Sequence, residues 1–92
     1  MLYYKKNMNS ETKLKEKLIS KLNLSNVDVI NNSHLHAGHI SSPNNGNSHF
    51  KVIIKDIEFS KLPKIKSHQL IYKILQEEMS SFIHALEIEI SA

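Results

Sequence analysis

Residues 49–55, His-Phe-Lys-Val-Ile-Ile-Lys, alternate between two kinds of side chain. One side of the alternation is apolar and consists of Phe50, Val52 and Ile54. The opposite side is more polar and consists of His49, Lys51, Ile53 and Lys55. A period of two residues is that of a β-strand with one buried face. This stretch therefore predicts a strand, and the rest of the fold is worked out from it.

Two further elements are predicted on the N-terminal side of this strand. Leucines recur every fourth residue between Ser10 and Asn23, with lysines and glutamates between them, which indicates an amphipathic helix with Ser10 as a possible N-cap. Residues 27–30 favour β-structure and are bounded by asparagines. They predict a strand antiparallel to 49–55. Residues 1–9 show no usable period and predict a disordered tail.

Three segments follow the strand on its C-terminal side. Residues 56–62 are interpreted as a turn, and the apolar stripe of residues 65–79 predicts a second helix. Residues 83–90 alternate again and predict a third strand, in which His84 shares the apolar face with Leu86, Ile88 and Ile90.

The order helix-strand-strand-helix-strand predicts an α+β fold. The crossover helix makes the last two strands parallel, so the three-stranded sheet is mixed, and the helices cover one of its faces. Ninety-two residues suffice for one hydrophobic core, and residues 10–92 are therefore interpreted as a single domain.

Composition narrows the possible chemistry. The chain has no cysteine, so it offers neither a disulfide nor a thiolate ligand of its own. The formal net charge is +3, yet all twelve basic residues are lysines. The absence of arginine weakens the case for sequence-specific DNA reading, because guanidinium is the group that binds guanine and phosphate in bidentate fashion.

No apolar run reaches the roughly 20 residues that a membrane-spanning helix needs, and the N-terminus lacks the pattern of a secretory signal. We therefore expect a soluble, cytoplasmic protein without a membrane partner. We expect no enzymatic activity either, because no Ser-His-Asp or Cys-His arrangement is visible and no catalytic residue is assigned.

Histidines are the most informative polar residues. His34, His36 and His39 fall in one long polar segment, residues 33–48, where either solvation or metal binding would explain them. His84 is predicted on an apolar face, where an imidazole needs either a hydrogen-bond partner or a metal. Clustering and phase alone leave both interpretations open.

Four strings, taken in order, extend the argument: NNSHLHAGH at 31–39, SHFKVII at 48–54, SHQLIYKIL at 67–75 and FIHALEI at 82–88. Together they resemble the BolA-like family over about residues 11–91. The resemblance implies a fold akin to the type II KH domain but without its Gly-x-x-Gly loop, since Gly38 and Gly46 lie far apart.

The resemblance also implies a function. Members of the family partner monothiol glutaredoxins in binding and transferring 2Fe-2S clusters, and the family is linked to stress response and, in some members, to transcription. Glutaredoxin and glutathione each supply one sulfur to the shared cluster. The matching ligand positions in this chain are His84 and His36, with His34 and His39 as alternative ligands from the loop. The free protein is expected to be a monomer or a weak dimer.

Two alternatives remain. The first is a DNA-binding transcriptional regulator that uses Lys64, Lys66 and Lys73 against phosphate; the family usually shows basic residues on both sides of the position matching His68, whereas this chain has a serine and a glutamine there. The second is a zinc module built from loop histidines, although structural zinc usually takes four protein ligands.

Overall fold

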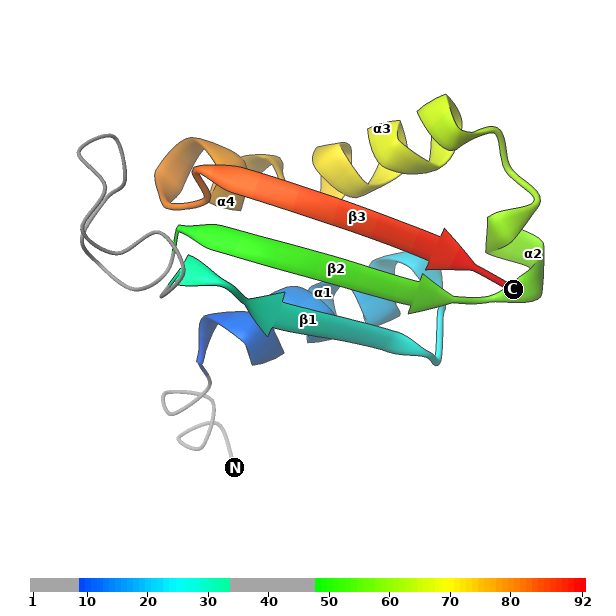
Figure 1. Ribbon diagram of the computed structural model, residues 1–92, viewed down its shortest axis with the longest axis horizontal. Helices are drawn as coiled ribbons and strands as arrows, with labels where there is room; N and C mark the ends of the chain where they lie inside the picture. The colour runs from blue at the N-terminus through cyan, green and yellow to red at the C-terminus, as the bar shows by residue number, and fades with distance from the viewer. Residues whose placement is uncertain (1–8, 34–47) are drawn as a thin grey trace.

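Three strands form one mixed sheet in the order β1-β2-β3. The structure, a computed structural model, describes residues 9–33 and 48–92. Figure 1 shows the elements in this part of the chain: α1 (Ser10–Leu22), β1 (Val27–Asn31), β2 (His49–Lys55), α2 (Ile57–Ser60), α3 (Lys64–Ile74), α4 (Gln76–Ser81) and β3 (Ala85–Ser91). The predicted tail, apart from Asn9, and most of the predicted loop lie outside the described residues.

The sheet has the predicted topology. β1 pairs with β2 antiparallel, with Val29 opposite Val52. β2 pairs with β3 parallel, with His49 in register with Ala85 and Lys55 with Ser91. β2 has the bounds that its alternation predicts. Because β2 and β3 run in the same direction and in register, the chain enters both strands at the same end of the sheet. This end, where His49 and Ala85 lie, is the entry edge of the two strands.

The N-cap of α1 lies one residue earlier than predicted. The N-cap is Asn9 rather than Ser10, and its side-chain oxygen accepts a hydrogen bond from the amide of Thr12 at 2.8 Å. At the other end, Asn23 adopts a left-handed conformation with φ 55° and ψ 46°, which stops the helix.

Two predictions for the second half of the chain are wrong. Residues 56–62 are not only a turn, because Asp56 caps the short helix α2 by accepting a hydrogen bond from the amide of Phe59. The single helix predicted over 65–79 is two helices, α3 and α4, which meet at Leu75. Leu75 keeps a bond to the Ile71 carbonyl but leaves helical geometry, with φ −97° and ψ 16°.

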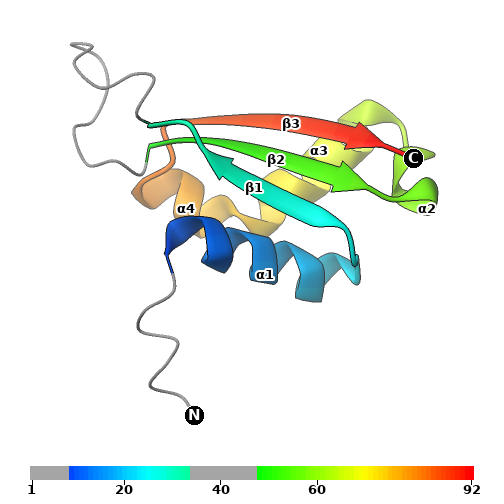
Figure 2. The ribbon, with the colours of Figure 1, turned by 60° about the horizontal axis from the view of Figure 1, so that its bottom comes forward.

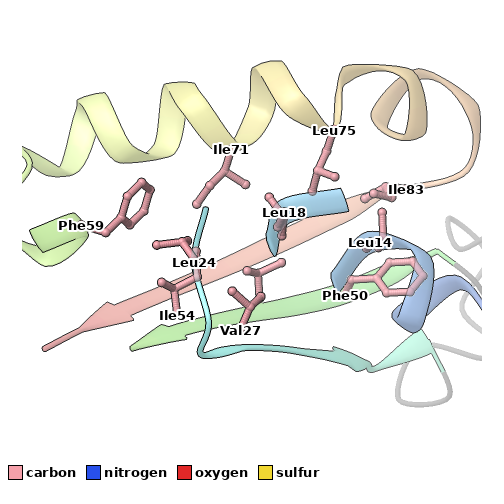
Figure 3. Close-up of a cluster of buried hydrophobic side chains, with 11 residues drawn as sticks. Leu14, Leu18, Leu24, Val27, Phe50, Ile54, Phe59, Ile71, Leu75 and Ile83 are labelled. Atoms are coloured by element: carbon pink, nitrogen blue, oxygen red, sulfur yellow. The ribbon is translucent and has the colours of Figure 1, made fainter. Parts of the chain in front are cut away.

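All three longer helices lie on one side of the sheet, as predicted (Figure 2). Their apolar stripes meet the apolar side of β1 and β2, and burial of this surface is the main stabilising term of a small domain. Figure 3 shows how the side chains from helices and strands converge. The buried set is Leu14, Leu18, Leu24, Val27, Phe50, Val52, Ile54, Phe59, Ile71, Leu75 and Ile83.

Candidate functional site

The entry edge of β2 and β3 brings two histidines together. The Ser48 carbonyl accepts hydrogen bonds from the amides of His84, at 2.7 Å, and Ala85, at 3.1 Å. These bonds fix the start of β3 beside the start of β2. The imidazole rings of His49 and His84 consequently lie with their centroids 5.3 Å apart and their planes inclined at 55°.

The two rings differ in accessibility. His49 is 8% exposed, and its Nδ1 lies 2.8 Å from the hydroxyl of Ser48, a hydrogen bond whose direction follows the tautomer of the ring. His84 is exposed. Of this pair, His84 is therefore the imidazole that a group arriving from outside can reach.

Ser33 joins the two chain ends that border the same edge. Its hydroxyl oxygen accepts hydrogen bonds from the amides of Ser48, at 2.8 Å, and His49, at 3.0 Å. The amide of Asn32 donates to the His49 carbonyl at 2.8 Å. Ser33 and Ser48, the described residues that flank the three loop histidines in the sequence, are therefore hydrogen-bonded to each other at the edge where His84 lies.

The predicted ligands divide between described and undescribed parts of the chain. His84 lies at the sheet edge, but its predicted placement was wrong: β3 begins at Ala85, so His84 precedes the strand and is exposed instead of sharing the apolar face. His34, His36 and His39 lie outside the described residues. Within residues 9–33 and 48–92, no group of three His, Asp or Glu side chains is arranged to hold a metal ion.

Sequence reasoning missed the supporting residues of this edge. His49 was predicted on the polar side of its strand, yet it is buried, because the His84 ring and the Ser48 hydroxyl lie against it. Ser33 was interpreted only as a polar loop residue, although it is 6% exposed and binds two amides. The parallel register of β2 and β3 is what assembles these residues, and no single string contains it.

The lysines proposed for phosphate binding all lie on α3. Lys64, Lys66 and Lys73 are exposed, and the sequence of this helix contains no acidic residue. No ion pair involves any of the three in the described part of the chain. His68 lies on the same helix, is half-buried and faces a groove shared with β3.

Taken together, the three-stranded mixed sheet, its single helical layer and the paired imidazoles at one edge define a small α+β protein with a histidine-bearing sheet edge. A family model described as BolA-like protein matches residues 18–92. The chain belongs to the BolA-like family.

Curated relatives support this assignment. The DNA-binding transcriptional regulator BolA of Haemophilus influenzae is 39% identical over 62 residues, which cover 67% of this chain and 56% of the relative. A BolA-like protein of Dictyostelium discoideum is 38% identical and covers 85% of this chain and 66% of the relative. SufE-like protein 1 of Arabidopsis thaliana is 36% identical over 83% of this chain, but this chain spans only 22% of its length.

Solved structures confirm the fold. BolA1 from Arabidopsis thaliana superposes with a TM-score of 0.76 at 30% identity and covers 91% of this chain and 92% of its own. The BolA domain of SufE1 from the same plant gives a TM-score of 0.76 at 34% identity, covering 91% and 93%. Among the described residues, no helix has the length and apolar character needed to cross a membrane.

Proposed function

We propose that this chain partners a monothiol glutaredoxin in holding a 2Fe-2S cluster, with His84 supplying one imidazole ligand. The observation that carries the proposal is the exposed position of His84 at the entry edge of β3, where its amide binds the Ser48 carbonyl and Ser48 in turn binds the Ser33 hydroxyl. A ligand shared with a second protein must be reachable from outside, and His84 meets this requirement.

The donor set of the chain fits a shared cluster better than a cluster of its own. A cysteine-free chain cannot supply the sulfurs that usually hold such a centre. Its described residues offer one exposed imidazole at this edge, so the remaining ligands come from elsewhere. In the proposal, glutaredoxin and glutathione give the sulfurs and a loop histidine gives the second imidazole.

His36 is the loop histidine that we propose. It follows Ser33 by three residues, so an extended chain carries it no farther than about 11 Å from the Ser33 Cα. His34 and His39 remain the alternatives. When bound, a cluster with neutral imidazole in place of thiolate is less negative and has a higher reduction potential, which suits electron acceptance or transfer to another protein.

The relatives add support for an iron-sulfur setting. The matching part of SufE-like protein 1 is a BolA domain within a protein whose SufE name relates it to iron-sulfur proteins. The proposal includes a link to stress response and iron homeostasis. It also includes a cytoplasmic location for this chain, although two relatives are named as chloroplastic or mitochondrial proteins.

Reconstitution tests the proposal. The protein is mixed with a monothiol glutaredoxin, glutathione, iron and sulfide, and the visible absorption and circular dichroism of the complex are recorded. His84→Ala should change the spectrum and weaken cluster retention, whereas the matched variant His68→Ala, on α3, should leave both unchanged. An unchanged spectrum for His84→Ala, with an intact fold by amide NMR, would remove His84 as a ligand.

The same reconstitution separates the loop candidates. Each of His34, His36 and His39 is replaced by alanine in turn, and the spectrum of each complex is compared with that of the unmodified chain. The proposal requires His36→Ala to have the largest effect. If the spectra of all three variants equal that of the unmodified chain, no loop histidine is a ligand.

A second function, DNA binding, has one specific observation in its favour: the exposed Lys64, Lys66 and Lys73 of α3, a helix whose sequence contains no acidic residue. A relative named as a DNA-binding regulator matches the chain. If Lys64, Lys66 and Lys73 each contact one phosphate, log K should fall with log salt with a slope of about −2.7. Absence of binding to duplex DNA at low salt would remove this candidate.

A further inference from the structure

The outer edge of β3 carries backbone groups that no other strand in the described part of the chain pairs with. β3 stands at the end of the sheet order and pairs only with β2. The Ala85 amide donates to Ser48 and the Ser91 carbonyl accepts from Asp56, so both residues direct their backbone groups toward β2. Since this direction alternates along a strand, Leu86, Ile88 and Ile90 present their amides and carbonyls outward.

The α3 helix extends beyond this edge. In the face-on view of Figure 1, α3 runs outside β3, and Figure 2 places it on the helical side of the sheet. Between them lies a groove of about 370 Å³. Its lining includes Leu62, Lys64, His68, Ile88, Glu89 and Ile90. A strand added beside β3 would therefore lie over α3, which forms the floor beneath it.

This edge carries charged side chains, Glu87 and Glu89, but lacks several of the other usual protections against pairing. Exposed edge strands are commonly interrupted by proline, shortened or bent by a bulge. β3 is seven residues long, contains no proline and pairs with β2 residue for residue without a break. Leu62, at the groove, remains 39% exposed. An incoming apolar side chain would cover this residue together with the half-buried Ile88 and Ile90.

Charge decides between the possible occupants. Glu87 and Glu89 lie on the open face of β3. The ammonium of Lys51 pairs with both carboxylates, at 4.0 Å from an oxygen of Glu87 and 3.1 Å from one of Glu89. Within this group of three side chains, one negative charge therefore remains in excess. A second copy paired antiparallel about Ile88 would place Glu87 opposite Glu89 of the other chain, and like charges directly opposite are destabilising. The groove lining holds one lysine, Lys64, and one glutamate, Glu89, so it offers phosphate groups no excess of positive charge.

We propose that the outer edge of β3 takes up an extended segment of a partner protein, in which apolar side chains entering the groove alternate with basic side chains facing Glu87 and Glu89. The backbone of the segment pairs with Leu86, Ile88 and Ile90, and alternate side chains give specificity, as in other cases of strand addition. This site is independent of the proposed cluster, so His84→Ala should bind the segment normally.

A synthetic peptide, acetyl-KIKVKIK-amide, serves as the probe for the full chain labelled with ¹⁵N. Its binding should shift the amide resonances of Leu86, Ile88 and Ile90 and slow their hydrogen exchange by about tenfold or more, because these amides become hydrogen-bonded. The acidic control acetyl-EIEVEIE-amide should bind at least about tenfold more weakly. Equal binding of the two peptides, or shifts confined to other elements, overturns the proposal.

Two isomers of the probe test the backbone pairing without altering the protein. One carries three N-methyl groups at its apolar residues and the other carries three at its first three lysines, so each lacks three donors on one side of the strand. One isomer should lose at least about tenfold in affinity and the other should retain it. Loss for the apolar set indicates antiparallel pairing, and loss for the lysine set indicates parallel pairing. Equal affinities of the two isomers overturn the proposal.

Two further arms test the charge argument and the class of occupant. Glu89→Lys should weaken binding of the basic probe, while Glu11→Lys on α1, far along the chain, should not. A single-stranded oligonucleotide is titrated under the same conditions. If it shifts the amides of Leu86, Ile88 and Ile90 more strongly than the peptide does, nucleic acid is the occupant and the proposal fails.

Discussion

Ser33 and His49 are joined twice: the Ser33 hydroxyl oxygen accepts a hydrogen bond from the His49 amide at 3.0 Å, and it lies 3.5 Å from the His49 carbonyl oxygen, to which it donates. Both residues are buried. One side chain at the end of β1 thus satisfies backbone groups at the start of β2. This arrangement fixes the start of β2 to the end of β1, on both sides of the segment between them.

We expect Ser33→Ala to destabilise the protein by about 1 to 3 kcal/mol, because it leaves buried amides without their acceptor. Chemical denaturation followed by circular dichroism measures this free energy. Ser80→Ala is the matched control, since the Ser80 hydroxyl bonds to the Gln76 carbonyl at an exposed site; it should change stability by no more than about 0.5 kcal/mol. Equal effects of the two substitutions would contradict the structural role of Ser33.

The central strand and the sheet topology could be predicted from the sequence, because a period of two and the placement of a crossover helix are local signals. The break at Leu75 could not. Ile71, Leu75 and Met79 continue the spacing of four residues across it, and no glycine or proline marks it. The helix α2 had a signal that was overlooked: Asp56 is a good N-cap residue three positions before the buried Phe59.

The site was predictable only in part, for a related reason. His84 was singled out by its phase and by resemblance, but its exposure depends on where β3 begins. That start is set by the Ser48 carbonyl, which binds the amides of His84 and Ala85. A contact between residues 36 positions apart is a property of the parallel register and has no local signature in either string.

The core should depend most strongly on the face of α1 that meets the sheet. Leu18 is fully buried within the hydrophobic cluster. Leu18→Ala should cost about 2 to 5 kcal/mol, which combines lost transfer free energy with the cavity left behind. The control Ile65→Ala removes a side chain that is 68% exposed and should cost about 0.5 kcal/mol or less. Thermal unfolding distinguishes the two, and a small effect at Leu18 would argue against this core.

The C-terminus of α1 gives a prediction about backbone conformation. Asn23 holds a left-handed conformation with φ 55°, which costs most residues other than glycine and asparagine about 1 kcal/mol or more. Asn23→Ala should therefore destabilise the protein by about 1 kcal/mol, whereas Asn23→Gly should be close to neutral. Denaturant titration of both variants measures the difference, and identical stabilities would contradict the assigned conformation.

An ion pair between α1 and α4 predicts a dependence on alkaline pH. The Lys17 ammonium lies 3.0 Å from a carboxylate oxygen of Glu78 and 3.6 Å from one of Glu77. The hydrogen bond with Glu78 raises the pKa of Lys17 above its ordinary value of 10.5, against the opposing effect of burial. A pKa that is higher in the folded state contributes stability that is fully present below 10.5 and is lost as the pH rises through the folded value.

The stability of the unmodified chain should therefore fall more between about pH 9.5 and about pH 11.5 than that of Glu78→Gln, which lacks the charged partner. Glu11→Gln, on the first turn of α1, is the control and should follow the unmodified chain. Urea titrations of the three proteins at the two pH values measure these changes in stability. The pKa of Lys51 is also raised, through its hydrogen bond with Glu89. All three proteins should therefore lose some stability in this pH range. Only the difference attributable to Glu78 reports on Lys17, and a parallel decline in all three would show that this pair does not couple α1 to α4.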